Sequence, residues 1–456
     1  MPVTDLTCFK AYDIRGRLGE NLDEDIARRI GAGFAKALGA RKVVLGRDIR
    51  ASSEALSAAV AEGLTGQGVE VLDLGLSGTE EMYFATTHFG ADGGICVTAS
   101  HNPMDYNGMK MVKAGSAPLD PATELARVKA MAEADLAPVA TRGEGLPAEG
   151  ARAAYIARVL SFVDIAALKP LKLLVNAGNG AAGPTFDAIL EALVAQGAPL
   201  EVERLHHDPD PSFPNGIPNP LLDENQPVTG AAVRAQGADL GIAWDGDFDR
   251  CFLFDAEGRF IPGEYVVGLL AEAFLVKEPG AKIVHDPRVV WNTQDIVARL
   301  GGEAVQSRTG HAFVKQVMRE TRAVYGGEMS AHHYFRDFMA CDSGMIPWLL
   351  VIELMSRRGQ PLAALVDDRR AAFPSSGEIN FRVDDVADVI ARIEATYAPD
   401  ATTRDDTDGL SLAFDTWRFN LRASNTEPLL RLNVEARGDA DLLAARVEEL
   451  RALIET

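Results

Sequence analysis

Three repeats of one pattern limit the folds that this chain can adopt. Each repeat begins with a basic residue, a short apolar run and a polar turn, and continues with a helix-like segment and two further strand-like runs. The segments made of a basic residue, an apolar run and a polar turn are 41–48, 172–179 and 282–288. The two further predicted strands are 69–74 and 94–98 in the first repeat, 200–205 and 240–244 in the second, and 303–306 and 324–327 in the third. Alternating strands and helices predict layered α/β units. Ligand sites in such units lie outside the carboxyl ends of the strands.

The boundaries of the repeats are marked by changes in composition. Turn-rich stretches occur at 132–150, 255–262 and 373–377. Beyond the last of them the pattern changes to a strand at 379–383, a helix at 386–397, several strands between 410 and 434, and a helix from Ala440, which is typical of a small α+β domain. At about 150 residues per domain, the chain has room for about three or four domains. We expect them at 1–145, 146–255, 256–370 and 371–456.

Charge and cysteine content exclude several classes of protein. The chain has 66 acidic and 45 basic residues, a net charge of −21, which argues against nucleic acid or an anionic membrane as the main partner. Its 4 cysteines form no C-x-x-C pair, so neither a disulfide framework nor a thiolate zinc site is indicated. The first residues lack the apolar segment of a signal peptide, and longer apolar runs contain charges. We therefore expect a protein of the reducing cytoplasm.

Three alternating carboxylates, Asp245, Asp247 and Asp249, follow the third strand of the second repeat. On an extended backbone all three would point the same way. At a separation of ~5 Å and an effective dielectric constant of ~20, each pair would repel by roughly 3 kcal/mol, which a bound cation would relieve. Oxygen ligands favour Mg²⁺ or Ca²⁺ over zinc, and a short loop favours Mg²⁺. A solvated acidic turn is the alternative, which the apolar flanks disfavour.

Two other loops carry polar side chains that could take part in binding or chemistry. Ser100 follows the third strand of the first repeat and precedes Pro103, so its hydroxyl is expected on a defined turn. The glycines of a hydrolase nucleophile elbow are missing, and an ordinary turn serine is the alternative. Near the C-terminus, Arg422, Ser424, Asn425 and Thr426 precede a proline, a composition that suits an anion. A plain hairpin turn would also fit this loop.

A G-x-G-x-x-G motif at 178–183 offers a competing interpretation. It follows a strand-like run, and Glu201 and Glu203 come about twenty residues later, as in dinucleotide-binding folds. An NAD-dependent oxidoreductase is therefore the alternative function. The motif is short, lies in the middle repeat and explains neither the aspartates nor the other polar loops.

Taken together, the loops at 98–103, 245–250, 327–332 and 422–426 resemble the four signature loops of the α-D-phosphohexomutases. The resemblance covers essentially the whole chain and includes segments 12–16 and 213–220. Within the family, segment 326–347 is most similar to the bacterial phosphomannomutases. Phe248 stands where the family usually has glycine, a variant also seen in that bacterial subgroup.

The resemblance implies a fold and a central site. The fold would comprise three related three-layer α/β/α domains and a C-terminal α+β domain similar to TATA-binding-protein-like folds. Ser100 would carry a phosphoryl group. One Mg²⁺ per active site would be held by Ser100, Asp245, Asp247 and Asp249. The remaining site residues by similarity are Arg15, His101, Lys110, Arg250, His311 and His332 as catalytic groups, and Tyr12, Arg288, Glu328, Ser330, Arg422, Ser424, Asn425 and Thr426 as substrate ligands.

The reaction implied is the interconversion of mannose 6-phosphate and mannose 1-phosphate through a phosphoserine and a hexose 1,6-bisphosphate, feeding GDP-mannose synthesis. The bisphosphate would also act as activator. General acid and base duty stays open among Lys110, His311 and His332, and so does the choice between monomer and dimer. A dual-specificity enzyme that also uses glucose phosphates, and a phosphosugar-binding protein without catalysis, are further alternatives.

Overall fold

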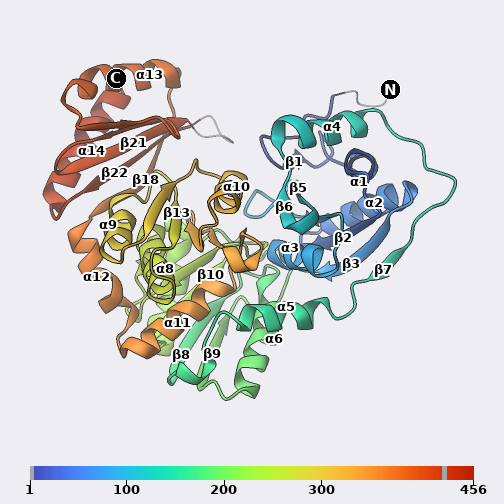
Figure 1. Ribbon diagram of the computed structural model, residues 1–456, viewed down its shortest axis with the longest axis horizontal. Coiled ribbons are helices and arrows are strands. Elements are labelled where there is room, and N and C mark those ends of the chain that lie inside the picture. Colours follow the sequence, from blue (N-terminus) through green and yellow to red (C-terminus); the bar gives the residue numbers. More distant parts are fainter. Residues whose placement is uncertain (1–4, 424–428) are drawn as a thin grey trace. The chain divides into compact units, whose positions relative to one another are not determined.

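The computed structural model describes residues 5–423 and 429–456 (Figure 1). The chain divides into two compact units. The first unit comprises Met1–Phe260 and Asp337–Gly359, and the second comprises Ile261–Arg336 and Gln360–Thr456. The predicted phosphate ligands Ser424, Asn425 and Thr426 lie outside the described residues. None of the described helices combines the length and the apolar character that crossing a bilayer requires.

The first sheet has the strand order β1-β5-β4-β2-β3-β7, with β6 paired to β5. Its strands are β1 (Ile14–Arg17), β2 (Lys42–Arg47), β3 (Glu70–Leu76), β4 (Gly93–Val97), β5 (Tyr106–Lys113), β6 (Ala117–Pro118) and β7 (Gly145–Pro147). The helices of this region are α1 (Glu24–Leu38), α2 (Ser53–Gly66), α3 (Thr79–His88) and α4 (Ala126–Glu133). Helix α1 begins where the Asp23 side chain accepts a hydrogen bond from Ile26 N, and it ends at Gly39, whose φ is 63°.

The second sheet has the order β12-β11-β10-β8-β9. Its strands are β8 (Leu171–Asn176), β9 (Leu200–Leu205), β10 (Leu240–Trp244), β11 (Cys251–Phe254) and β12 (Phe260–Ile261), and its helices are α5 (Ala151–Leu160), α6 (Ala182–Ala195) and α7 (Gln226–Gln236). Helix α11 (Ile346–Arg358) belongs to the same unit. It is anchored there because Trp244 Nε1 donates to Gly344 O at 2.9 Å and the Trp348 ring packs on Phe186.

The second unit contains the third repeat. The strands β13 (Lys282–His285), β14 (Glu303–Gln306), β15 (Tyr325–Gly327) and β16 (His333–Phe335) lie in the order β14-β13-β15-β16. The helices are α8 (Gly263–Lys277), α9 (Trp291–Arg299), α10 (His311–Thr321) and α12 (Leu362–Ala372). Each repeat places its first strand between two parallel neighbours, and its third strand pairs antiparallel with the strand that follows. The α/β class predicted from the repeats is thus confirmed.

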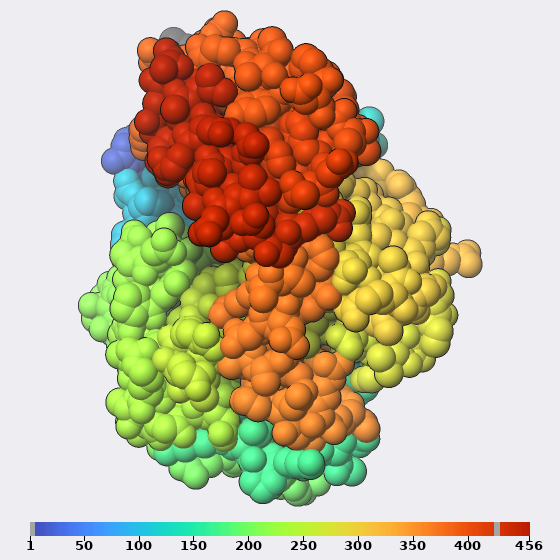
Figure 2. Space-filling model, turned by 90° about the vertical axis from the view of Figure 1, so that its left-hand side faces the viewer, coloured from blue at the N-terminus to red at the C-terminus, as the bar shows by residue number. Residues whose placement is uncertain are grey.

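The C-terminal part of the second unit is an antiparallel sheet of order β18-β22-β21-β20-β19. It comprises β18 (Ser375–Phe381), β19 (Thr403–Asp405), β20 (Leu410–Ala413), β21 (Trp417–Ala423) and β22 (Leu430–Ala436), with helices α13 (Val386–Tyr397) and α14 (Ala440–Ile454) packed on it. Figure 2 shows this segment, coloured deep orange to red, as one continuous block. Its core is formed mainly by aliphatic and aromatic side chains of the strands and of both helices.

The polar turns predicted after the first strands of the second and third repeats are present. Strand β8 ends at Asn176, and Gly178 and Asn179 after it adopt φ values of 59° and 57°. Strand β13 ends at His285, and the Asp286 side chain after it accepts a hydrogen bond from Arg288 N at 2.8 Å, which closes a turn.

Candidate active site

The acidic loop begins where the buried strand β10 ends at Trp244. Our prediction of an extended backbone is wrong here: Phe248 N donates to Asp245 O at 3.2 Å, and Phe248 has a φ of 47°. The loop is therefore a turn. The convergence of the carboxylates nevertheless holds, since oxygens of Asp245, Asp247 and Asp249 lie within 4.8 Å of one another and all three residues are buried.

The serine loop lies against this turn. Ser100 Oγ donates to Asp245 Oδ2 at 2.6 Å and lies 3.1 Å from His101 Nδ1. Ser100 is only 1% exposed, and its φ of 50° marks a left-handed backbone that costs energy for a residue with a side chain. A residue in this conformation is held there by its surroundings, so the hydroxyl has a fixed position beside the carboxylates.

Arg50 holds the backbone of the serine loop, and the sequence analysis did not identify it. Its guanidinium donates to the carbonyl oxygens of Ser100 at 2.9 Å, Pro103 at 2.9 Å and Asn102 at 2.5 Å. Arg50 follows β2, whose carboxyl end lies at the same edge of the sheet as that of the parallel strand β4. That topological position is the signal that could have drawn attention to it.

Lys110 of β5 brings a buried positive charge into the acidic cluster. Its Nζ donates to Asp247 Oδ2 at 2.7 Å and also to Asp249. Burial acts to lower the pKa of Lys110, but the charges of Asp247, Asp249 and Asp245 outweigh it and raise that pKa. In the same cluster, burial and the charges of Asp247 and Asp249 raise the pKa of Asp245 to about 7. Burial opposes ionisation of Asp247 as well, but the charge and hydrogen bond of Lys110 hold its pKa below the ordinary value.

The cluster fits a hard divalent cation. The Oδ1 atoms of Asp245 and Asp247 are buried and receive no hydrogen bond from any residue that the structure describes. A buried carboxylate oxygen without a partner is costly, and a cation would remove that cost. Because the ligand set consists of carboxylates and hydroxyl oxygen, it suits Mg²⁺ rather than zinc.

Four further predicted residues of the first unit lie around the serine loop or close to it. Arg15 of β1 donates from Nη1 to Asn102 Oδ1 at 2.5 Å and from Nε to Asp13 at 3.0 Å. Arg250 Nε lies 3.5 Å from Asp245 Oδ2. Burial and the charges of Arg250 and Arg15 lower the pKa of His101, which favours a neutral imidazole. Tyr12 is half-buried in the turn before β1.

The second unit contains a separate group of predicted residues, centred on three arginines. Arg288, Arg422 and Arg431 contact the carboxylate of Glu378 at 3.1, 2.9 and 3.0 Å. Although burial acts in the opposite sense, these three guanidinium groups lower the pKa of Glu378 to about 2. Burial and the charge of Arg288 lower the pKa of Arg422. Three guanidinium groups thus share the carboxylate of Glu378, although Arg288 also pairs with Asp286 and Glu328. Guanidinium groups gathered in this way suit a planar anion such as phosphate. Glu378 and Arg431 were missed by sequence reasoning, because no local motif distinguishes them.

Glu328 follows β15 and has both carboxylate oxygens engaged. Gly310 N donates to Oε1 at 2.8 Å and the Tyr334 hydroxyl donates to Oε2 at 2.5 Å. Arg288 Nη2 lies 3.7 Å from Oε1. The rings of His311 and His332 lie 6.4 Å apart, and Ser330 is half-buried in the same loop. The structure thus brings Arg288, Glu328, His311 and His332 together within this unit.

The glycine motif at 178–183 has a packing role. A β-carbon at Gly178 would lie 2.3 Å from Pro218, and one at Gly183 would lie 2.1 Å from His207 O. Gly180 approaches the acidic loop, where its β-carbon would lie 3.1 Å from Gly246 O, and Ala181 N donates to that oxygen. These glycines let the chain pack against itself, and the dinucleotide-binding alternative is not favoured.

Comparisons with known proteins identify the family of the chain. Models of the phosphoglucomutase/phosphomannomutase family match all four regions: α/β/α domain I at residues 7–137, domain II at 153–258, domain III at 262–373 and the C-terminal domain at 378–453. A phosphomannomutase of Salmonella montevideo is 60% identical over 99% of this chain and 100% of its own length. An enzyme of Xanthomonas campestris described as "Phosphohexose mutases" is 56% identical, over 98% of this chain and 99% of its own.

A solved structure of a phosphoglucomutase/phosphomannomutase family protein from Burkholderia thailandensis superimposes with a TM-score of 0.87 at 34% identity. The match covers 99% of this chain and 97% of that one. Fold and site together define an enzyme of the phosphohexomutase class, an isomerase. The chain belongs to the phosphoglucomutase/phosphomannomutase family, and the predicted resemblance to its bacterial phosphomannomutases is confirmed.

Proposed function

We propose that this chain is a phosphomannomutase that interconverts mannose 6-phosphate and mannose 1-phosphate through a phosphoserine at Ser100. The observation that carries the proposal is the 2.6 Å hydrogen bond from Ser100 Oγ to Asp245 in the acidic cluster. A hydroxyl so placed is adjacent to the carboxylates that would hold a cation beside its phosphate. Full-length relatives named phosphomannomutase support the same assignment.

The reaction proceeds through two phosphoryl transfers. In the first, the bond between phosphorus and Ser100 Oγ breaks, a bond to the C1 oxygen of mannose 6-phosphate forms, and the hydroxyl proton passes through a base to Ser100. Before the second transfer the resulting 1,6-bisphosphate turns over in the site. The bond between its C6 oxygen and phosphorus then breaks, a bond from phosphorus to Ser100 Oγ forms, the serine proton passes through an acid–base group to the C6 oxygen, and mannose 1-phosphate leaves. Such transfers depend on positioning and on neutralisation of charge rather than on covalent chemistry by the protein.

The acidic cluster supplies the ligands for one metal ion. Asp245, Asp247, Asp249 and a phosphate oxygen on Ser100 would hold Mg²⁺, which neutralises charge on the transferring group. Arg15 and His101 contact the serine loop, and Arg250 contacts the acidic loop. We assign all three to the transferring phosphoryl group. General acid and base duty falls to Lys110, His311 or His332.

The second unit would hold the sugar and its other phosphate. Arg422, with Arg288 and the predicted ligands Ser424, Asn425 and Thr426, forms the proposed phosphate clamp. The gathering of three guanidinium groups at Glu378 supports it. Glu328 and Ser330 are assigned to the sugar hydroxyls and Tyr12 to the substrate. Because the sugar must bind in two orientations, one clamp serves both phosphate positions.

Several finer points belong to the same proposal. A hexose 1,6-bisphosphate would act as activator by rephosphorylating Ser100, and the product would feed GDP-mannose synthesis. The four cysteines are buried thiols, which suits a reducing compartment, and we assign the cytoplasm. We also propose domain boundaries after residues 145, 255 and 370, while monomer and dimer both remain open.

A coupled assay with two substrates tests the proposal. Mannose 1-phosphate should be converted in the presence of Mg²⁺, conversion should stop with a chelator, and Ser100→Ala should remove nearly all turnover. Normal turnover by Ser100→Ala would refute the mechanism. Glucose 1-phosphate in the same assay tests the dual-specificity alternative, which the name of the Xanthomonas campestris relative favours. Binding without conversion would instead indicate a phosphosugar-binding protein.

A further inference from the structure

The N-terminal residue of helix α3 contacts the acidic loop through both its backbone and its side chain. Thr79 Oγ1 donates to Asp247 Oδ2 at 2.5 Å, and Thr79 N donates to Asp247 O at 3.2 Å. Thr79 is fully buried, with 0% exposure. Its hydroxyl and Lys110 Nζ therefore hold the same carboxylate oxygen, and the other oxygen of Asp247 is left without a hydrogen bond.

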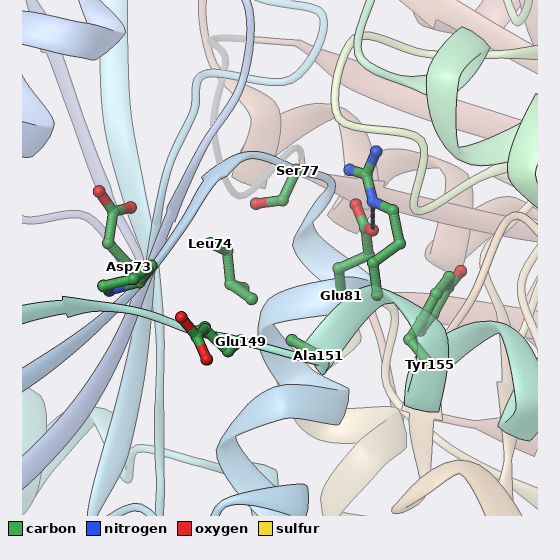
Figure 3. A pocket seen from close by; sticks show the side chains of 10 residues that line it. Asp73, Leu74, Ser77, Glu81, Glu149, Ala151 and Tyr155 are labelled. Atoms are coloured by element: carbon green, nitrogen blue, oxygen red, sulfur yellow. Dashed lines mark hydrogen bonds and ion pairs between the residues drawn. The ribbon is translucent and has the colours of Figure 1, made fainter.

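Glu81 fixes the end of the helix on which Thr79 stands. Its Oε2 accepts from Gly78 N at 2.9 Å and from Thr185 Oγ1 of helix α6 at 3.2 Å. Its Oε1 pairs with Arg152 Nε of helix α5 at 3.1 Å. Figure 3 marks this ion pair with a dashed line beside Glu81. One buried carboxylate thus connects the start of α3 to two helices of the second α/β region.

Glu80 makes a second set of buried connections. Its Oε2 accepts from Gly344 N at 2.5 Å, ahead of helix α11, and its Oε1 accepts from the Tyr155 hydroxyl of α5. Glu80 and Glu81 therefore both contact helix α5, whereas Thr79 points to the acidic loop. Only Thr79 contacts the acidic loop with its side chain.

Phe248 holds the loop against the same helix end. Its ring lies so close to Gly78 that a β-carbon there would come within 2.2 Å of the ring. Phe248 is fully buried, so the loop cannot lift from α3 without exposing an aromatic ring. The acidic loop and the start of α3 consequently pack together, and the Thr79 hydroxyl contacts the predicted metal ligand Asp247 there.

We propose that Thr79 is a positioning residue for Asp247. By holding Oδ2 from the helix end, the hydroxyl fixes the rotation of the carboxylate about its Cβ–Cγ bond and directs Oδ1 toward the cation. Groups that orient a metal ligand typically contribute 10- to 100-fold to metal affinity or activity. The inference depends on the proposed function only in taking Asp247 as a metal ligand.

The inference is tested by comparing metal binding of the wild type with that of Thr79→Val, Thr79→Ser and Thr86→Val. Mn²⁺ serves as the probe, and its dissociation constant is measured by electron paramagnetic resonance of the free ion. Thr79→Val removes the hydroxyl with little change in volume, and it should weaken Mn²⁺ binding about tenfold. Thr79→Ser keeps the hydroxyl and should bind like the wild type. Thr86→Val is the matched control, because Thr86 is equally buried on α3 but donates within the helix to Met82 O.

Equal dissociation constants for Thr79→Val and Thr86→Val would overturn the inference. If Thr79→Val fails to fold, as judged by its melting temperature, Thr79→Ala takes its place under the same criterion. In steady-state kinetics, Thr79→Val should raise the Mg²⁺ concentration required for half-maximal rate while leaving KM for the sugar phosphate near the wild-type value. Absence of Mn²⁺ binding in the wild type would instead count against the metal site of the proposed function.

Discussion

The carbonyl oxygen of Ser100 lies so close to Gly246 that a β-carbon at residue 246 would come within 2.7 Å of it. The serine loop and the acidic loop therefore meet at a glycine, and their separation depends on the absence of a side chain there. We predict that Gly246→Ala forces the loops apart and lowers kcat about 100-fold, because a displacement near 1 Å has effects of that order.

The control for this substitution is Gly145→Ala. Gly145 lies in β7, and a β-carbon there would meet no atom within 4 Å. Steady-state kinetics of both variants provide the measurement. A Gly246→Ala enzyme with the kcat of Gly145→Ala would show that the two loops tolerate separation.

Lys110 is the buried countercharge of the acidic cluster, and Lys110→Met should leave three carboxylates without it. Loss of one partner from a buried ion pair costs about 3–5 kcal/mol, so the variant should melt at a lower temperature. Added Mg²⁺ should then raise the melting temperature of Lys110→Met more than that of the wild type, since the ion would replace the missing charge. Scanning calorimetry with and without Mg²⁺ measures both effects. Equal Mg²⁺ shifts would argue against a shared role of lysine and metal.

Glu378 predicts a loss of stability in acid. Its pKa is lowered from 4.5 to about 2, so its ionised form stabilises the fold by about 3 kcal/mol above the unfolded pKa. This contribution is lost as pH falls from about 4.5 to about 2. Glu378→Gln should therefore melt below the wild type at pH 7, and the difference should shrink at pH 4 and pH 3. Glu449→Gln, at an exposed residue of α14, is the control. A difference that is independent of pH would exclude the ion pairs as its cause.

The raised pKa of Glu80 predicts the opposite dependence of stability on pH. Burial raises its pKa from 4.5 to about 8, so the folded protein binds a proton that the unfolded chain releases between these values. Stability from this group is present at low pH and falls as pH rises from about 4.5 to about 8. Glu80→Gln mimics the protonated form, and its melting temperature relative to the wild type should increase from pH 5 to pH 8. Exposed Glu62→Gln should show no such trend, and a flat profile for Glu80→Gln would contradict the prediction.

The sequence allowed the repeats and the positions of the polar loops to be predicted, because apolar periodicity and turn residues act locally. The predicted strands at 200–205, 240–244 and 303–306 match β9, β10 and β14. The conformation of the acidic loop was not predictable, because it depends on Phe248 adopting a φ of 47° against Gly78, a contact between residues far apart in the chain.

Residues that support the site from a distance were also missed. Thr79 contacts Asp247 across 168 positions, and Arg50 reaches the serine loop across about 50. Neither residue belongs to a motif. The role of each becomes visible only in the folded structure, where segments far apart in the chain come into contact. Loop chemistry can thus be predicted from local composition, whereas the groups that hold the loops require the fold.

The most direct measurement locates the residue that carries phosphate after incubation of the enzyme with its activator. The protein is incubated with Mg²⁺ and a hexose 1,6-bisphosphate, digested, and analysed by mass spectrometry for phosphopeptides. Our account predicts acid-stable phosphate on Ser100 alone, and none in protein carrying Ser100→Ala. An active enzyme whose phosphate is found on another residue, or on none, would contradict it.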